Sequence, residues 1–164
     1  MKIVVLSDTH VPISAKSLPR KVYEYLKTCD LIIHAGDIVE PSFMKELETF
    51  APVRAVKGNM DNPSLQESLP EYLIVEANGK KIGIAHGKGP STKVVQSVAE
   101  IFDRKVDIII FGHSHSPVNE KRGNILFFNP GSPTDTVFAP YRSFGVLDIS
   151  DTGAVSSEII RIED

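Results

Sequence analysis

The stretch Lys2-Ile3-Val4-Val5-Leu6-Ser7-Asp8-Thr9-His10 sets the pattern for the whole chain. A continuous apolar run of this kind is typical of a strand buried on both faces, and here it ends abruptly at polar residues. Asp8 and His10 are two residues apart, so both side chains can face one ion as the chain leaves the strand. The stretch predicts an α/β protein with a carboxylate and an imidazole at a strand end.

The same arrangement recurs four times. Each further motif follows a predicted apolar strand: Gly36-Asp37, Gly58-Asn59, His86-Gly87 and Gly112-His113-Ser114-His115. Ligands of open α/β sheets bind at the carboxyl ends of strands, so the five strand ends could converge on one site. The motifs then supply seven candidate metal ligands: Asp8, His10, Asp37, Asn59, His86, His113 and His115.

The order of predicted elements favours two packed sheets flanked by helices. The first part of the chain alternates strands and helices, which predicts parallel strands with right-handed crossovers. The expected elements there are strands at 2–7, 31–34 and 53–56, a helix over roughly 18–28 and a helix after Pro41. The later part is mostly β, with a hairpin at 72–76 and 80–85, a helix bearing Val94 to Phe102, and strands at 107–111, 116–121, 124–128, 143–149 and 154–162.

Size and composition narrow the classes of protein. A length of 164 residues favours one domain over 1–164. The net charge of −3 argues against broad binding to nucleic acid but permits a phosphate substrate, since bound cations would supply positive charge. The single cysteine, Cys29, allows no intrachain disulfide, and the N-terminal apolar run is too short for a signal peptide or membrane span. We expect a cytoplasmic protein with no membrane partner.

Mixed oxygen and nitrogen donors suit Mn²⁺, Fe or Zn²⁺ and argue against dedicated Mg²⁺ or Ca²⁺ sites. Asp37 is a lone carboxylate in its motif and could bridge two ions, because each of its oxygens has lone pairs to give. We expect two divalent ions per chain, with Mn²⁺ as first choice and Fe, Zn²⁺ or Ni²⁺ as alternatives.

The ordered motifs D-x-H, G-D, G-N, H-G and G-H-x-H resemble the calcineurin-like metallophosphoesterase superfamily. The resemblance covers Asp8 to His115, with Asn129-Pro130-Gly131-Ser132 matching a further element, and the short length is similar to the small prokaryotic phosphodiesterase branch. It implies a four-layer α-β-β-α sandwich with two mixed sheets. It also implies two ligand sets that share Asp37 as the bridge: Asp8, His10, Asp37 and His115 for one ion, and Asp37, Asn59, His86 and His113 for the other.

By the same resemblance, the expected reaction is metal-dependent hydrolysis of small phosphate esters, phosphodiesters foremost, by a hydroxide that bridges the two ions. Asp37, Asn59 and His86 are the expected catalytic residues, and the small members of this branch imply a homodimer or homotetramer. One alternative is a non-catalytic scaffold of the same fold, because the retromer scaffold subunit resembles this branch. Another is a phosphomonoesterase or nuclease. All seven ligand positions are filled, which favours an enzyme.

One position departs from the superfamily pattern. Many members read G-N-H-D or G-N-H-E, and that histidine is taken to assist the leaving group. This chain has Gly58-Asn59-Met60-Asp61, and a thioether cannot donate a proton. The sequence therefore predicts an intact metal site without the usual leaving-group acid.

Several residues have simpler interpretations. Asp8 could cap a turn, Asp37 could cap the helix near Pro41, and Asn59 could be a turn residue, although Asn62 fits a turn better. His34 lies inside an apolar strand and is interpreted as structural or as a hydrogen-bonding support for a ligand carboxylate or the backbone.

The segment after Gly131 also leaves two interpretations open. Ser132 and Thr134 could serve only as turn residues. Phe138 and Tyr141 could either wall a substrate pocket or be buried in the second sheet.

Overall fold

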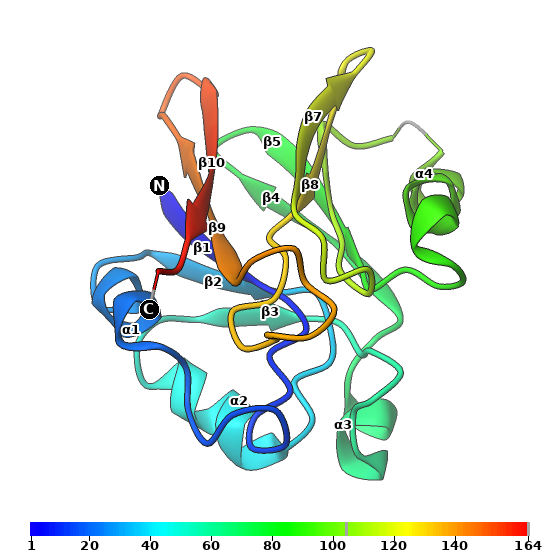
Figure 1. Cartoon of the computed structure of the whole chain (residues 1–164). Coiled ribbons are helices and arrows are strands. Elements are labelled where there is room, and N and C mark those ends of the chain that lie inside the picture. The colour runs from blue at the N-terminus through cyan, green and yellow to red at the C-terminus, as the bar shows by residue number, and fades with distance from the viewer. Residues whose placement is uncertain (104, 164) are drawn as a thin grey trace.

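Two five-stranded sheets form the centre of the molecule (Figure 1). The structure is a computed structural model and describes residues 1–103 and 105–163. The strands of the first sheet lie in the order β10-β9-β1-β2-β3, and those of the second in the order β4-β5-β6-β8-β7. The first sheet consists of β1 (Lys2–Leu6), β2 (Leu31–His34), β3 (Val53–Ala55), β9 (Ser143–Ile149) and β10 (Val155–Arg161). The second consists of β4 (Tyr72–Ala77), β5 (Lys80–Ala85), β6 (Ile108–Ile110), β7 (Val118–Arg122) and β8 (Ile125–Asn129).

Both sheets are mixed, and their parallel strands bring the predicted motifs to one edge. In the first sheet, β1, β2 and β3 are parallel, while β9 and β10 are antiparallel additions. In the second sheet, β5, β6 and β8 are parallel, while β4 and β7 pair antiparallel at the two edges. The carboxyl ends of parallel strands meet at the same edge of a sheet, so each sheet delivers its strand-end motifs together.

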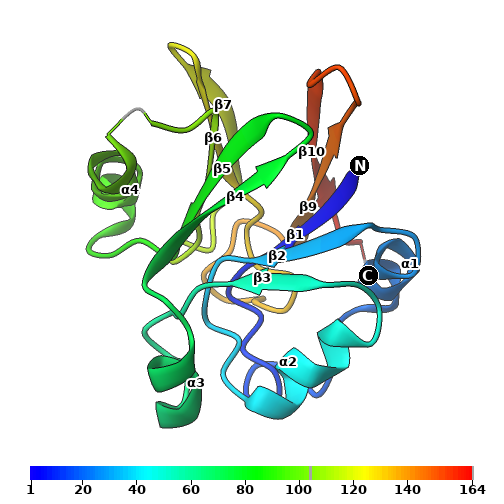
Figure 2. The ribbon, with the colours of Figure 1, turned by 180° about the vertical axis from the view of Figure 1, so that it is seen from behind.

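Helices cover the outer faces of the sheets (Figures 1 and 2). Helices α1 (Arg20–Leu26) and α2 (Pro41–Glu48) pack on the first sheet, and α4 (Val94–Phe102), preceded by the 3₁₀ turn η1 (Ser91–Lys93), packs on the second. This is the predicted α-β-β-α sandwich. Within the residues that the structure describes, no helix combines the length and hydropathy of a membrane span.

Three apolar clusters match the three interfaces between the four layers. Alternate residues of a strand point to opposite faces, and β1 shows this directly. Val4 and Leu6 pack toward α1 and α2, whereas Ile3 and Val5 pack between the sheets. The third cluster joins α4 to the outer face of the second sheet. Both faces of β1 are therefore buried, which explains its unbroken apolar sequence.

The main difference from the sequence prediction is a short helix, α3 (Pro63–Ser68). Asn62 caps it by accepting the Leu65 backbone N–H at 3.0 Å, and Pro63 occupies its first turn. Six residues with one buried apolar side chain, Leu65, give no helical periodicity to detect. The other predicted elements are present, with ends that differ by a few residues; the first helix, expected over 18–28, covers only Arg20–Leu26.

Candidate metal centre

Backbone hydrogen bonds fasten four of the five motifs together in two pairs. The Asp8 N–H donates to Gly36 O at 3.0 Å, and the His10 N–H donates to Asp37 O at 3.1 Å. These two bonds join the loops after β1 and β2. The Gly112 N–H donates to the His86 carbonyl at 3.1 Å, which joins the loops after β5 and β6.

The two sheets are joined at the centre by Asp8. The His113 N–H donates to both carboxylate oxygens of Asp8, at 3.2 Å to Oδ1 and 3.0 Å to Oδ2. The Ser7 hydroxyl donates to Oδ2 at 2.7 Å. Residue 8 follows a strand of the first sheet and residue 113 follows a strand of the second, so this contact places both sets of strand ends in one site.

Glycine is required where these loops pass each other. A β-carbon at Gly112 would lie 1.8 Å from Ser7 Oγ and 2.7 Å from Asp8 Oδ2. Gly36 has φ +96°, and a β-carbon there would lie 2.7 Å from His86 Nδ1. Neither position leaves room for a side chain, so the glycines of the motifs allow the close approach of the ligands.

The backbone is strained at most of the candidate ligands. Asp8, His10, Asp37, His113 and His115 all have positive φ, between 46° and 68°. Non-glycine residues rarely adopt this conformation, and such strain costs on the order of 1–3 kcal/mol per residue and gathers at functional sites. The surrounding contacts maintain a geometry that these residues would not adopt for stability alone.

Two carboxylates occupy the middle of the cluster, and each turns one oxygen toward the imidazoles. Asp37 Oδ1 accepts the Met60 N–H at 2.7 Å, while Oδ2 lies 3.5 Å from His10 Nε2 and 3.4 Å from His86 Nε2. Asp8 Oδ1 lies 3.4 Å from His115 Nε2 and 3.9 Å from His86 Nε2. Both carboxylates are therefore placed between imidazoles of the two expected ligand sets.

The histidines form two pairs on either side of these carboxylates. The His10 and His115 ring centroids are 5.3 Å apart, and those of His86 and His113 are 5.2 Å apart. Asn59 Oδ1 lies 3.1 Å from both His86 Nε2 and His113 Nδ1. The structure thus brings all seven predicted ligands together. Candidate ligand atoms form two groups, and the atoms inside each group all lie within 4.8 Å of one another. One group comes from Asp8, His10 and His115, and the other from Asp8, Asp37 and His86.

Hydrogen bonds fix which nitrogen of the His86 and His113 rings faces the centre. His86 Nδ1 donates to the Ala35 carbonyl at 2.7 Å, and His113 Nε2 donates to the Gly89 carbonyl at 3.0 Å. A carbonyl only accepts, so these nitrogens carry the protons, and His86 Nε2 and His113 Nδ1 are turned to the centre. Holding the outer nitrogen in this way is the usual arrangement of a histidine that binds a metal.

The donor set fits two divalent cations. His10 Nε2 is buried and has no hydrogen-bond partner among the described residues, as expected for a nitrogen reserved for a metal. Burial lowers the pKa of His86, but Asp37 and Asp8 outweigh it and raise that pKa to about 9. Burial likewise opposes ionisation of Asp37, yet the His86 contact and the Met60 N–H lower its pKa. The carboxylates thus favour positive charge around them. Protons on the imidazoles supply this charge in the metal-free protein, and bound metal ions would displace those protons.

The structure bears on two simpler interpretations from the sequence. Asp37 does not cap α2; Glu40 occupies the N-cap position, and its side chain makes no capping hydrogen bond. His34 is fully buried, which agrees with a structural role, and its hydrogen-bond partner among the described residues is a side-chain hydroxyl instead of a ligand carboxylate or the backbone. Its Nε2 lies 3.0 Å from the hydroxyl of Thr9.

Other supporting residues are more important than the sequence indicated. The Ser132 hydroxyl donates to Asp8 O at 2.7 Å, and the Thr134 hydroxyl donates to Thr9 O at 2.8 Å. They hold the segment after β8 against the segment after β1, where the two ribbons cross in Figure 1. Their role was not evident because hydroxyls after a glycine are common turn residues.

Two acidic residues were missed as supports. Asp61 accepts the N–H groups of Val39 and Gly58, both at 2.7 Å, and so holds the Asn59 turn. Asp135 contacts His115 Nδ1 directly. Asp135 follows the N-P-G-S element by only three residues, but no spacing rule links it to His115.

The seven candidate ligands differ in how far they are exposed to solvent. Asp8, His10, Asp37 and His86 are buried, whereas Asn59 is exposed and His113 and His115 are half-buried. A hollow of about 240 Å³ opens beside Asn59, His86 and His113 and is also lined by Lys57 and Lys88.

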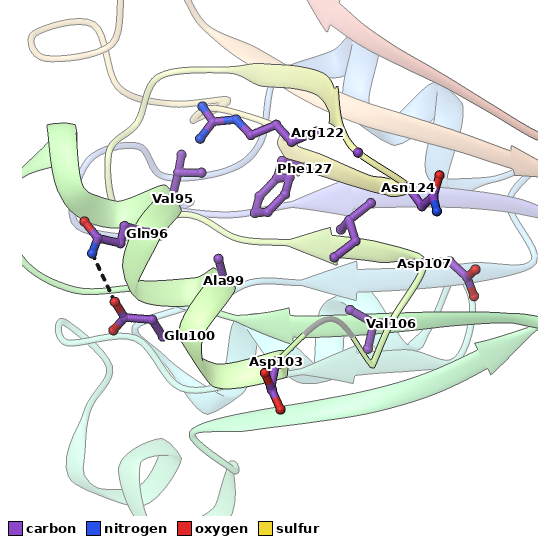
Figure 3. A pocket seen from close by; sticks show the side chains of 12 residues that line it. Val95, Gln96, Ala99, Glu100, Asp103, Val106, Asp107, Arg122, Asn124 and Phe127 are labelled. Atoms are coloured by element: carbon purple, nitrogen blue, oxygen red, sulfur yellow. Dashed lines mark hydrogen bonds between the residues drawn. The ribbon is translucent and has the colours of Figure 1, made fainter.

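A larger hollow, of about 970 Å³, lies elsewhere, between α4 and the β7–β8 hairpin (Figure 3). Gln96 and Glu100, which are joined by a hydrogen bond of 3.1 Å, line this hollow together with Phe127. None of the seven candidate ligands lines it.

The family of the chain follows from its sequence and this geometry. Residues 1–152 match the calcineurin-like phosphoesterase superfamily domain. The chain belongs to this superfamily. The two groups of candidate ligand atoms come from the strand-end motifs of the sequence.

Individual relatives agree with this membership. A probable metallophosphoesterase of Methanocaldococcus jannaschii is 36% identical over 100% of this chain and 83% of its own length. A phosphodiesterase of the same organism is 31% identical over 80% of this chain and 83% of its own length. Among solved structures, Vps29 of Entamoeba histolytica complexed with Zn²⁺ superposes with a TM-score of 0.76 at 28% identity, covering 98% of this chain and 99% of that one.

Proposed function

We propose that the chain is a dinuclear metal-dependent phosphodiesterase. The observation that carries this proposal is the position of the two central carboxylates, each between imidazoles that belong to different ligand sets. A protein that used this fold only as a scaffold would gain nothing from the backbone strain at five of these ligands.

The proposed ligand sets are those expected from the resemblance. Asp8, His10 and His115 would hold one ion and Asn59, His86 and His113 the other, with Asp37 shared between them. When bound, two ions would supply positive charge to a phosphoryl oxygen and lower the pKa of water. Asp37, Asn59 and His86 are proposed to be the groups nearest the reacting phosphate, because Asn59 and His86 line the adjoining hollow and His86 Nε2 lies 3.4 Å from Asp37 Oδ2.

The shape of the site favours a small phosphodiester. Substrate would approach over Asn59 and His113, where the centre is open, and the adjoining hollow of about 240 Å³ could accept one ester arm. Lys57 and Lys88 line this hollow, and their positive charge would offset negative charge on the substrate. The chain's net charge of −3 does not favour a long nucleic acid at this site.

Three further properties belong to the same proposal. Mn²⁺ is the first choice of ion, with Fe, Zn²⁺ and Ni²⁺ as alternatives, because the donors mix oxygen and nitrogen. A homodimer or homotetramer and a cytoplasmic location are also proposed; the single cysteine suits a reducing compartment.

The decisive experiment is a hydrolysis screen with metal analysis. The metal-stripped protein is reloaded separately with Mn²⁺, Zn²⁺, Fe²⁺, Ni²⁺ or Mg²⁺ and assayed on phosphomonoesters and phosphodiesters. We expect close to two bound Mn²⁺ ions per chain and faster turnover of diesters. Preferential turnover of monoesters would replace the diesterase proposal with a monoesterase.

A scaffold remains the second candidate because the Vps29 structure has this fold over nearly its full length. The same screen separates the two candidates. Fewer than about 0.2 ions per chain in every metal, together with no hydrolysis, would favour the scaffold. Metal binding without hydrolysis of any ester would also contradict the enzyme proposal.

A further inference from the structure

We propose that Asp135 is a positioning residue for the metal centre, holding His115 so that its Nε2 faces Asp8. This proposal rests on the proposed function, because it assigns His115 as a metal ligand. Asp135 lies outside the seven-ligand set, in the segment between β8 and β9.

The contact between Asp135 and His115 decides which nitrogen of the ring is available. Asp135 Oδ2 lies within hydrogen-bonding distance of His115 Nδ1, and Asp135 is only 8% exposed. An ionised carboxylate only accepts, so His115 Nδ1 must donate. The opposite nitrogen, Nε2, is then free of its proton in the neutral ring and points to Asp8 Oδ1, 3.4 Å away. Asp135 therefore fixes both the tautomer and the direction of the ring.

The Asp135 carboxylate is itself held in place by the backbone. Its Oδ1 accepts the N–H groups of Val137 at 2.7 Å and Phe138 at 3.0 Å, and its Oδ2 accepts the Ala139 N–H at 3.1 Å. The Asp135 N–H donates to Ser132 Oγ at 3.0 Å, and that hydroxyl in turn donates to Asp8 O. These bonds leave the carboxylate little freedom, so His115 is oriented by a fixed group.

The same carboxylate connects the centre to an exposed apolar segment. Val137 and Phe138 are 76% and 81% exposed, although their backbone N–H groups are held by Asp135. A bound ion that immobilises His115 would also immobilise Asp135 and the backbone N–H groups that its carboxylate accepts. Occupation of the centre and order in residues 137–139 are therefore coupled through one side chain.

The variant Asp135→Asn tests the positioning role with almost no change in size. In the amide orientation that keeps the bonds to Val137 and Phe138, the new NH₂ group faces His115 Nδ1–H, and two donors then oppose each other. His115 should adopt the other tautomer, with its proton on Nε2, or turn away. Loss of such a supporting partner typically weakens metal binding by about 10–100-fold.

Two measurements read this out in the full-length protein. Titration calorimetry with Zn²⁺ should show one of the two binding steps weakened by about 10–100-fold in Asp135→Asn. Imidazole ¹H–¹⁵N spectra of the metal-free protein at pH 10 should show the His115 proton on Nδ1 in wild type and on Nε2 in the variant. Amide hydrogen exchange at residues 137–139 should slow on Zn²⁺ binding in wild type and much less in the variant.

Asp107→Asn is the matched control. Asp107 also accepts a backbone N–H, that of Lys81 at 2.9 Å, but it lies at the start of β6, away from the centre. Its substitution should change neither Zn²⁺ affinity nor the His115 tautomer. If Asp135→Asn does not fold, Asp135→Ser replaces it. The serine hydroxyl can still accept the backbone N–H of residue 137, but the side chain is too short to reach His115.

The proposal is overturned if His115 keeps its Nδ1 proton in the folded variant and Zn²⁺ binding stays within twofold of wild type. Failure of the proposed function looks different. Wild type would then bind no Zn²⁺ and hydrolyse no ester, while the tautomer spectrum of the metal-free protein would still show whether Asp135 orients the ring. A wild-type His115 with its proton on Nε2 would overturn the positioning role directly.

Discussion

Gly58 lies so close to Asp37 that a β-carbon at position 58 would be 2.2 Å from Asp37 Oδ1. Met60, two residues after Gly58, donates its N–H to the same oxygen at 2.7 Å. The turn between them therefore wraps around the Asp37 carboxylate and presents Asn59 beside His86. The position of Asn59 depends on the absence of a side chain at residue 58.

Gly58→Ala should weaken metal binding as well as stability. The added methyl must displace Asp37 or the turn, and overpacking of this kind costs about 1–3 kcal/mol. We expect a lower melting temperature and loss of at least one bound Mn²⁺ by elemental analysis. The control is Gly123→Ala, where φ is +59° but no atom lies within 4 Å of the new β-carbon. It should lower stability through backbone strain alone; equal metal loss in both variants would contradict the argument.

Asp37→Asn should weaken the binding of both ions by at least about tenfold, or ~1.4 kcal/mol each. Asp37 Oδ2 lies between His10 and His86, which belong to different proposed sets. His115→Ala should mainly weaken the ion held with Asp8 and His10. Calorimetry with Zn²⁺ on each variant gives the stoichiometry and both affinities.

Asp8→Asn is the comparison that assigns the bridge, since Asp8 belongs to both groups of ligand atoms. If Asp37→Asn keeps both ions and Asp8→Asn loses both, the bridging role belongs to Asp8. Loss of both ions from Asp37→Asn alone supports the assignment to Asp37.

His34 should destabilise the protein in acid. Burial lowers its pKa to about 3, although the charges of Asp8 and Asp37 oppose this shift. The Thr9 hydroxyl donates to Asp37 O at 3.3 Å and so accepts from His34 Nε2, while His34 Nδ1 has no partner among the described residues. The folded protein thus keeps His34 neutral, and the unfolded chain binds a proton near pH 6.5.

Because the unfolded state binds more protons between pH 6.5 and about 3, stability must fall as the pH falls through this window. The loss from His34 is about 1.4 kcal/mol per pH unit. Denaturant unfolding of the metal-free protein at pH 6.5, 5.5 and 4.5 measures it as the difference between wild type and His34→Gln, in which the other histidines cancel. A difference that does not change with pH would show that His34 is protonated in the folded state.

The sequence predicted which candidate ligands lie together because their signal is local. Each candidate ligand follows an apolar run within a few residues, and the carboxyl ends of parallel strands meet by topology. Asp8 and His113 are far apart in sequence, yet the strand order brings them into contact. The sequence also predicted two packed sheets, because its first part alternates strands and helices and its later part is mostly β.

The supports of the site could not be predicted in this way. The contact between Asp135 and His115 depends on the path of an irregular loop, and α3 depends on a cap at Asn62 without apolar periodicity. Burial of Phe138, one of two options from the sequence, is wrong, since its side chain is 81% exposed. Loop paths are set by many long-range contacts, which a single sequence does not display.

Met60, its sequence neighbour Asp61 and the buried His34 do not supply a proton to a leaving group. Met60 is 51% exposed at the opening of the centre. Burial raises the pKa of the neighbouring Asp61, but both of its oxygens accept backbone N–H groups and the residue is only 7% exposed. His34 is fully buried. None of these side chains can protonate a departing oxygen beside residue 60.

The proposed enzyme should therefore depend on good leaving groups. A departing oxygen gains negative charge in the transition state, and a positioned acid typically contributes about 10²–10⁴-fold by protonating it. Aryl diesters such as bis-p-nitrophenyl phosphate should turn over far faster than alkyl diesters. Met60→His should accelerate alkyl diesters more than aryl ones, whereas the control Met60→Gln, which can donate a hydrogen bond but not a proton, should not. The measurement is log kcat plotted against leaving-group pKa for the three proteins. A shallow wild-type slope, or a Met60→His slope no flatter than wild type, would mean that another group supplies the proton and that Met60 has no bearing on this step.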